Sequence, residues 1–308
     1  MATAVADAPE ADLARRRITL IHNADSGDAS PTRASLLRLF SDAGYEVRYV
    51  SHDADWSAAL KQPAEFVVAV GGDGTVGRVI AALAGRKQQV AVLPTGTANN
   101  IADWLGIAGD IRDVVRGWPT DRVLPFDVWE VTSGATTVRM VEAIGGGFFA
   151  ACVARDHELE PPTYILGGPF DRALHMIRER IADEPARAWS VSLDGVDHSG
   201  WYIGVEVMNG RHIGPNVPLA ADASPGDGML DVVLMGAQHR DQLEARFDPR
   251  ACQPTQSGAL IRARDARLRP PVGAALHLDG EPWRRSHEDE FIDIRHAGVT
   301  LVLGQRSR

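Results

Sequence analysis

Apolar runs of strand length alternate with stretches of helical periodicity over roughly the first 125 residues of the chain. The runs that predict buried strands are residues 18–22, 45–50, 66–70 and 90–93. The stretches that predict helices are residues 31–43, 56–60, 76–84 and 99–105. Strands and helices in this order predict a mostly parallel sheet with helices on both faces.

After Pro125 the pattern changes to short strand-like runs separated by glycine, proline, aspartate and asparagine turns. These runs are residues 128–131, 136–141, 190–193, 201–208, 230–235, 274–278 and 291–294. Two helix candidates, residues 170–182 and 238–246, interrupt them. This pattern is typical of an antiparallel β-sandwich or barrel with insertions. We therefore expect an α/β domain at residues 18–125 and a β-sandwich domain at residues 126–296.

Composition narrows the classes of protein that the pattern allows. The 308 residues carry a net charge of −9, which argues against a nucleic-acid partner. No apolar run reaches the length of a membrane span, and residues 1–17 read as a disordered lead-in without the apolar core of a signal peptide. Cys152 and Cys252 are too few for a disulfide framework. A cytoplasmic location is therefore expected.

Three glycine- and hydroxyl-rich turns follow predicted strands. Residues 71–75, Gly-Gly-Asp-Gly-Thr, stand between a buried strand and a helix, where backbone N–H groups can approach a phosphate. Residues 94–100 and 23–27 follow two other strands, so a parallel sheet would place all three turns at one edge. Only Lys61 and Lys87 of the 32 basic residues are lysines, so a phosphate site must use backbone, arginine or a metal. A tight turn without a ligand is the alternative.

A dinucleotide site is a second alternative, because residues 72–77 satisfy the G-x-G-x-x-G pattern. That site also needs an acidic residue at the end of the next strand, to hold a ribose hydroxyl. The next strand ends instead in Pro94-Thr95-Gly96-Thr97, which weakens a hydride-transfer function. Three phosphate-binding turns together with Asp73 favour a nucleoside triphosphate and a metal ion. No P-loop motif is present in the sequence.

The ordered motifs resemble the diacylglycerol kinase and sphingosine kinase family of lipid kinases. The resemblance begins with residues 71–75 and 94–100 and covers the chain from about residue 18 onward. Its further motifs are the turn at residues 23–27, the Phe126-Asp127-Val128 step, the stretch from Asn209 through Asp227-Gly228 to Asp231, and Asp279-Gly280-Glu281. The resemblance implies a nucleotide-binding α/β domain, a β-sandwich domain and an active site in the cleft between them. It also implies that residues from about 297 to 308 return to the first domain.

The resemblance assigns roles residue by residue. It implies that ATP is bound by Asn23, Ser26, Gly27, Gly71, Gly72, Gly74, Thr75, Thr95, Gly96, Thr97 and Asn99. It makes Asp73 a ligand of Mg²⁺ or the group that acts on the acceptor hydroxyl, and it leaves open whether Asp73 or Glu281 is the base. Asp127 is a third acidic candidate for catalysis. Asp227 lies in a segment that resembles a second metal site, although Asp-Gly pairs are also ordinary hairpin turns.

The implied activity is that of an ATP-dependent, Mg²⁺-requiring lipid kinase acting on a diacylglycerol, a sphingoid base or a related lipid. Glu142 stands where the family has asparagine, and Asn100 where it commonly has aspartate, so the acceptor is left open. An NAD kinase-like enzyme is one alternative, but the Asn-Glu dipeptide of that pocket is absent from residues 126–159. A non-catalytic nucleotide- or lipid-binding protein is another.

Membrane contact is expected to be peripheral and transient, and a homodimer is possible. The arginines at 262, 264, 267 and 269 fit either a face toward anionic lipid or a solvated strand edge.

Overall fold

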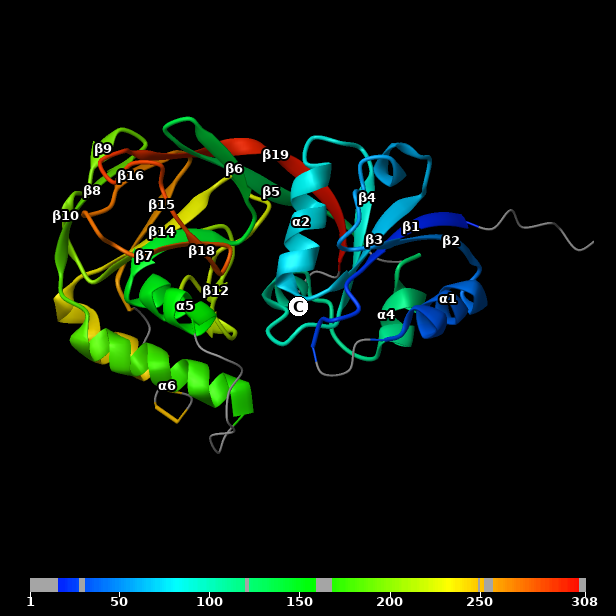
Figure 1. The fold of residues 1–308 in the computed structure, drawn as a ribbon, viewed down its shortest axis with the longest axis horizontal. Coiled ribbons are helices and arrows are strands. Elements are labelled where there is room, and N and C mark those ends of the chain that lie inside the picture. The colour runs from blue at the N-terminus through cyan, green and yellow to red at the C-terminus, as the bar shows by residue number, and fades with distance from the viewer. Residues whose placement is uncertain are drawn as a thin grey trace, which may run out of the picture.

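The computed structural model describes residues 16–27, 31–119, 122–158, 168–248, 250–251 and 257–304. Figure 1 shows two lobes side by side, an α/β lobe that holds the N-terminal part of the chain and a lobe of two sheets and helices. Most of the expected lead-in and Cys252 lie outside the described residues. The predicted fold class, an α/β domain with a parallel sheet followed by an antiparallel β-domain, is confirmed.

The first domain is a parallel sheet in the order β4-β3-β1-β2. Its strands are β1 (Arg16–His22), β2 (Tyr45–Ser51), β3 (Phe66–Gly71) and β4 (Gln89–Pro94). Every residue of β3 is buried, which explains its unbroken run of apolar side chains. The strand order reverses direction between β1 and β3, and open sheets of this kind bind ligands at that point.

Helices cover this sheet. They are α1 (Arg33–Asp42), α2 (Asp73–Leu83), α3 (Asn100–Trp104) and α4 (Ile111–Gly117). The backbone N–H of Ser35 donates to the side chain of Thr32, which caps α1. Helix α4 was not predicted from the sequence, and residues 56–60, which were predicted to be helical, form only a 3₁₀ turn at Ala59–Lys61. The predicted start of α2 at residue 76 is three residues late, because glycines at the start of a helix are more typical of a loop.

The second domain packs two antiparallel sheets face to face. One, in the order β15-β14-β11-β7-β17-β18, contains β7 (Ala143–Gly147), β11 (Gly204–Met208), β14 (Leu230–Met235), β15 (Ala259–Ala263), β17 (Leu276–Leu278) and β18 (Glu281–Trp283). The facing sheet contains β5 (Arg122–Ser133), β6 (Thr136–Met140), β8 (Arg187–Leu193), β9 (Val196–Asp197), β10 (Gly200–Tyr202) and β16 (Ala266–Arg269). Trp129, Trp189 and Val232 lie in the apolar core between them.

Three helices cover the outer face of the β7 sheet. They are α5 (Phe148–Glu158), α6 (Gly168–Asp183) and α7 (Arg240–Arg246). A second apolar core, which includes Phe148, Ile181 and Phe247, lies beneath them. A two-stranded hairpin of β12 (His212–Ile213) and β13 (Val217–Pro218) stands beside this layer. No helix within the described segments has both the length and the apolarity to span a membrane.

One long strand belongs to both domains. β19 (Ile292–Gly304) pairs with β16 near its start, with β5 along most of its length, and in parallel with β4 at Leu301 and Val302. The parallel sheet of the first domain and one sheet of the sandwich therefore form a single continuous sheet. β5 likewise spans the position near residue 125 where the sequence pattern changes. The last described residues lie against the first domain.

One predicted strand was wrong in an informative way. Residues 201–208 form two strands, β10 and β11, which belong to different sheets. β10 pairs with β8, while β11 pairs with β7 and β14, and the buried Ile203 lies between them. The hydrophobic pattern of an apolar run does not indicate where the chain bends from one sheet to another.

Candidate active site

The three turns singled out in the sequence meet at the carboxyl edge of the parallel sheet. The Asn23 backbone N–H donates to the Val70 carbonyl at 2.9 Å, and its side-chain amide donates to the Thr75 hydroxyl at 3.2 Å. The hydroxyls of Ser26 and Thr95 are 2.6 Å apart. These bonds join the turns after β1, β3 and β4 into one surface. All eleven residues expected to bind nucleotide lie in these turns.

The turns approach so closely that glycine is required. A Cβ atom on Gly96 would lie 2.4 Å from the Cα of Gly72, and one on Gly27 would lie 2.3 Å from the Thr95 carbonyl oxygen. Gly27 also has φ +66°, in the left-handed region that favours glycine. Asn99 has φ +54° and exchanges hydrogen bonds with the backbone of Gly96. The fold therefore presents backbone rather than side chains along this edge.

Asp73 is the first residue of α2 and points toward α3. Its carboxylate accepts a hydrogen bond of 2.9 Å from the backbone N–H of Ile101. Burial raises the pKa of the Asp73 carboxyl group, while backbone N–H groups of residues 73 and 99–101 lower it by a smaller amount. Asp73 thus ties the turn after β3 to the turn after β4 at the N-terminus of a helix, where anions are stabilised.

Two pockets lie on either side of Asp73. The first, which we name the loop pocket, has a volume of about 620 Å³ and is lined by the three turns together with His52, Arg78 and Arg139. The second, the apolar pocket, has a volume of about 320 Å³ and extends between α5, α6 and β12. Its apolar wall consists of Phe149, Cys152, Val153, Ala173, Met176, Ile177 and Ile213. One pocket suits phosphates, and the other suits a hydrocarbon chain.

The two pockets share one wall, which is made of Gly74 and four acidic residues. Asp73 comes from the first domain, whereas Glu142, Asp279 and Glu281 come from the second. The Glu281 side chain is exposed to both pockets. The wall is therefore where a group held in the loop pocket can meet a group held in the apolar pocket.

Asp279 is fixed by the turn that joins β6 to β7. Its Oδ1 accepts hydrogen bonds from the backbone N–H groups of Glu142 and Ala143, at 2.8 and 3.0 Å. Burial raises the pKa of the Asp279 carboxyl group to about 6, even though these N–H groups favour its charged form. Burial also raises the pKa of Glu142 well above its usual value, and the nearby carboxylates of Asp73 and Asp279 raise it further.

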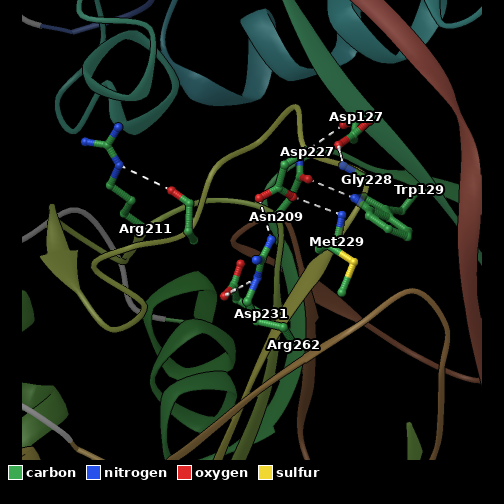
Figure 2. Close-up of polar contacts among 10 residues, drawn as sticks. Asp127, Trp129, Asn209, Arg211, Asp227, Gly228, Met229, Asp231 and Arg262 are labelled. Carbon is green, nitrogen blue, oxygen red and sulfur yellow. Dashed lines mark hydrogen bonds and ion pairs between the residues drawn. The ribbon is translucent and has the colours of Figure 1, made fainter. Parts of the chain in front are cut away.

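The structure does not bring Asp127 to either pocket. Asp127 is buried on β5, where its carboxylate accepts from the backbone N–H of Gly228 at 2.7 Å and lies 2.9 Å from Nε2 of His296. Figure 2 shows this contact with Gly228 beside Asn209, whose side chain accepts from the Trp129 indole and donates to the carbonyls of Asp127 and Val141. We infer that Asp127 positions the turn at Gly228.

Asp227, the expected second metal ligand, pairs with an arginine (Figure 2). Arg262 of β15 reaches the Asp227 carboxylate and lies 3.7 Å from the buried carboxylate of Asp231. Burial raises the pKa of Asp231 to about 6; Arg262 lowers it, and Asp227 and Asp222 raise it. Within the described residues, no three histidine, cysteine or acidic side chains gather closely enough to hold a metal. Arg262 supplies the positive charge beside Asp227 in this structure, and a metal role for Asp227 stays a prediction.

Several residues that line the two pockets were not assigned a role from the sequence. Glu142 and Asn100 were noted only as departures from the family pattern, and Asp279 only as part of a motif or a hairpin turn. Asp279 and Gly280 have φ of +49° and +79° and join β17 to β18 as the two-residue hairpin turn that an Asp-Gly pair favours, so this turn was predictable. The contact of the Asp279 carboxylate with the backbone of residues 141–143 was not predictable from the sequence. No motif in the sequence identified Arg78 and Arg139 as residues that line the loop pocket.

Comparisons with known proteins agree with the geometry. Residues 17–131 match the family model described as diacylglycerol kinase catalytic domain. A Cronobacter sakazakii protein named "Probable lipid kinase YegS-like" is 28% identical over 286 residues, covering 87% of this chain and 90% of the relative. A Stenotrophomonas maltophilia protein of the same name is 29% identical, covering 77% and 80%.

Solved structures show the same fold. A diacylglycerol kinase from Bacillus anthracis superposes with a TM-score of 0.67 at 15% identity, covering 94% of this chain and 97% of that one. Yeast NADH kinase in complex with NADH gives a TM-score of 0.53 at 11% identity, covering 94% and 83%. The expected resemblance to the diacylglycerol kinase family is confirmed.

Proposed function

Because residues 17–131 of this chain match the diacylglycerol kinase catalytic domain, we propose that the protein transfers the γ-phosphate of ATP to a hydroxyl group of a lipid, such as a diacylglycerol or a sphingoid base. The observation that carries the proposal is the acidic wall shared by two unlike pockets. The loop pocket offers backbone N–H groups and two arginines to phosphates. The apolar pocket offers hydrocarbon contacts to an acyl or alkyl chain.

The geometry suits phosphoryl transfer, which depends on positioning and on stabilisation of charge. The turns after β1, β3 and β4 hold the phosphates, with the N-terminus of α2 and the guanidinium groups of Arg78 and Arg139 beside them. The acceptor oxygen forms a bond to the γ-phosphorus while the bond to the bridging oxygen of ADP breaks. The hydroxyl proton passes to a carboxylate of the shared wall, either Asp73 or Glu281.

The shared wall also fits a magnesium ion. Carboxylate oxygens are the ligands that Mg²⁺ prefers, and kinases usually hold it with one or two carboxylates plus the phosphates of the nucleotide. Asp73 would be its protein ligand, and the ion would neutralise charge on the phosphates when bound.

We propose that the protein meets its substrate at a membrane surface, and the apolar pocket supports this. A lipid hydroxyl lies at the level of the head groups, so a short apolar pocket beside a polar wall is sufficient to receive it. We propose a peripheral and transient contact.

The proposal is tested by incubating the protein with labelled ATP, Mg²⁺ and a panel of lipids in mixed micelles, with NAD as a separate acceptor. Wild type is expected to label lipid and not NAD. The substitution that removes the base, either Asp73→Asn or Glu281→Gln, is expected to lower the rate by about 100-fold or more. Glu130→Gln, which removes an exposed carboxylate on β5 outside both pockets, is the matched control.

Two outcomes would overturn the proposal. Labelling of NAD alone would identify an NAD kinase-like enzyme. ATP binding without transfer to any acceptor would identify a binding protein.

A further inference from the structure

The hairpin of β12 and β13 belongs to the second domain but also contacts the first. It forms a two-stranded sheet of its own, in which Ile213 pairs with Val217 and residues 214–216 make the tip. Two residues of the tip have left-handed backbone, Gly214 at φ +54° and Asn216 at φ +57°. Asparagine is one of the few residues other than glycine that adopt this conformation readily. The tip is therefore built to carry an asparagine side chain.

Two asparagines exchange hydrogen bonds between this tip and the turn after β4. The side-chain amide of Asn216 donates to the carbonyl of Ala98 in the first domain at 2.9 Å. In the opposite direction, the side-chain amide of Asn100 donates to the carbonyl of Gly214 at 3.0 Å. Ala98 and Asn100 belong to residues 94–100, which form one of the three phosphate-facing turns. The hairpin is thus bonded directly to the nucleotide edge.

Trp104 makes a further contact between α3 and the hairpin. Its indole N–H donates to Nδ1 of His212 at 3.0 Å, and a Cβ atom on Gly210 would lie 2.5 Å from its ring. Burial lowers the pKa of His212, so that Nδ1 is unprotonated at neutral pH and accepts this bond. The helix whose Ile101 N–H group holds the Asp73 carboxylate is therefore packed against the hairpin.

The same hairpin forms part of the apolar pocket. Ile213, Gly214 and Pro215 line this pocket together with Phe149 of α5. A Cβ atom on Gly214 would lie 3.1 Å from the Phe149 ring, so the tip and the helix are in close contact. A hydrocarbon chain in the pocket would touch the residues that also carry the hydrogen bonds to the first domain.

From these contacts we propose that the hairpin couples the two pockets, and that Asn216 is the positioning residue of this coupling. The inference rests on the proposed function and adds a regulation of its site: an acceptor in the apolar pocket strengthens the binding of ATP in the loop pocket. The acceptor chain orders residues 213–215, and the bonds of Asn216 and Asn100 extend this order to residues 94–100 and α3. A turn that is already ordered loses less entropy when phosphates bind to it. By linkage, ATP strengthens acceptor binding by the same factor.

Asn216→Gly tests the side-chain bond without straining the backbone, since glycine also adopts a φ of +57°. Asn216 is exposed, and surface substitutions usually change stability little, so the variant should fold. The measurement is the Kd of a non-hydrolysable ATP analogue with Mg²⁺, in mixed micelles with and without the lipid that wild type labels, either dioctanoylglycerol or sphinganine. This lipid should lower the wild-type Kd by about 5-fold or more. In Asn216→Gly the effect should fall below about 2-fold, while the Kd without lipid stays near its wild-type value.

Hydrogen exchange gives a second measurement that needs no nucleotide. The lipid alone should slow amide exchange at residues 98–104 in wild type and should leave it unchanged in Asn216→Gly. Asp194→Gly is the matched control, because Asp194 also has a left-handed φ, +49°, in a turn of the second domain and lies outside both pockets. Its carboxylate accepts from the backbone N–H groups of Arg264 and Asp265, so this variant also loses side-chain bonds to backbone groups. It should keep the wild-type effect of lipid on the Kd.

The outcomes separate this inference from the proposed function. An undiminished effect of lipid in Asn216→Gly would overturn the inference and leave the lipid kinase intact. A wild-type protein that labels lipid but binds the ATP analogue equally tightly with and without it would do the same. An equal loss of the effect in Asp194→Gly would also overturn the inference, since the loss would then not depend on the contact with Ala98. A protein that labels no lipid at all would overturn the proposed function instead.

Discussion

Replacing Gly96 by alanine tests whether the contact between the turns after β3 and β4 shapes the phosphate-facing edge. An ideal Cβ on Gly96 lies 2.4 Å from the Cα of Gly72 and 3.2 Å from its backbone nitrogen. Carbon atoms in contact are separated by about 3.5–4.0 Å, so the shortfall is about 1 Å or more. Because the colliding atoms are backbone, no change of rotamer can relieve the overlap, and the turns must move apart.

This displacement predicts a larger effect on activity than on folding. A misplacement of about 1 Å in a positioned site costs about 100-fold in rate. Overpacking of this size costs about 1–3 kcal/mol of stability, which leaves most domains folded. We therefore expect Gly96→Ala to unfold at a somewhat lower urea concentration, and its kcat/KM for ATP to fall about 100-fold. Steady-state kinetics with varied ATP and urea unfolding measure the two effects separately.

Gly72→Ala is the matched control, since it adds the same methyl group to the other side of the contact. Its Cβ would lie 3.1 Å from the Cα of Gly96, so a shift of a few tenths of an ångström relieves the overlap. The loss of activity should be clearly smaller than in Gly96→Ala. A Gly96→Ala variant that keeps the wild-type kcat/KM for ATP would contradict this expectation, as would a Gly72→Ala variant that loses more activity than Gly96→Ala.

Three further predictions concern the second domain. Asp231→Asn removes a buried carboxyl group whose pKa is raised to about 6 from 3.8. Because the folded protein keeps this proton to a higher pH than the unfolded chain does, wild-type stability should fall by about 2 kcal/mol more than that of the variant as pH rises from about 4 to about 7, measured by urea unfolding. If the free energy of unfolding changed with pH in the same way in wild type and in Asp231→Asn, this expectation would be contradicted. Arg262→Ala leaves Asp227 and Asp231 without their half-exposed guanidinium partner. The substitution should lower the free energy of unfolding by about 1–2 kcal/mol at neutral pH. In the absence of nucleotide, Mg²⁺ should raise the Tm of the variant but not the Tm of wild type. A variant whose Tm ignores Mg²⁺ would argue against a cation site occupied by Arg262. Asn209→Ala leaves the Trp129 indole and the backbone carbonyls of Asp127 and Val141 without their hydrogen-bond partner. Urea unfolding should show that the free energy of unfolding falls by about 3 kcal/mol. A near-neutral effect would contradict the stabilising role of these buried hydrogen bonds.

The phosphate-facing edge was predictable because its signals are local. A buried apolar strand followed by Gly-Gly-Asp-Gly-Thr and a helix defines a turn, and parallel strands bring such turns to one edge. The hydrogen bonds of Asn23 and Ser26 to the neighbouring turns follow from that arrangement. The sequence could not show how near the turns come, since the contact of Gly72 with Gly96 depends on how two strands are spaced.

The centre of the second domain was not predictable, because tertiary contacts there override local preference. β7 contains three glycines, which are unfavourable in strands, yet it is a central and fully buried strand. A Cβ on Gly145 would lie 2.0 Å from the Glu206 carboxylate, which bonds His277 across the strand at 2.8 Å. The glycine makes room for a buried pair whose members are distant in sequence. The place of Glu142 at the wall follows from this strand.

The shared strand β19 has a consequence for how the chain folds and how it can be divided. An excised segment ending near residue 125 would keep β4 paired with β3 but would lose β19 on the other side of β4, so the edge of a hydrophobic sheet would be left open to pairing with other chains. The remaining segment would keep β19 with its final residues protruding from the sandwich. Neither half is a self-sufficient folding unit, and the two lobes should unfold in one cooperative transition. Nucleotide bound to one lobe would then protect amide protons in the other from exchange with solvent.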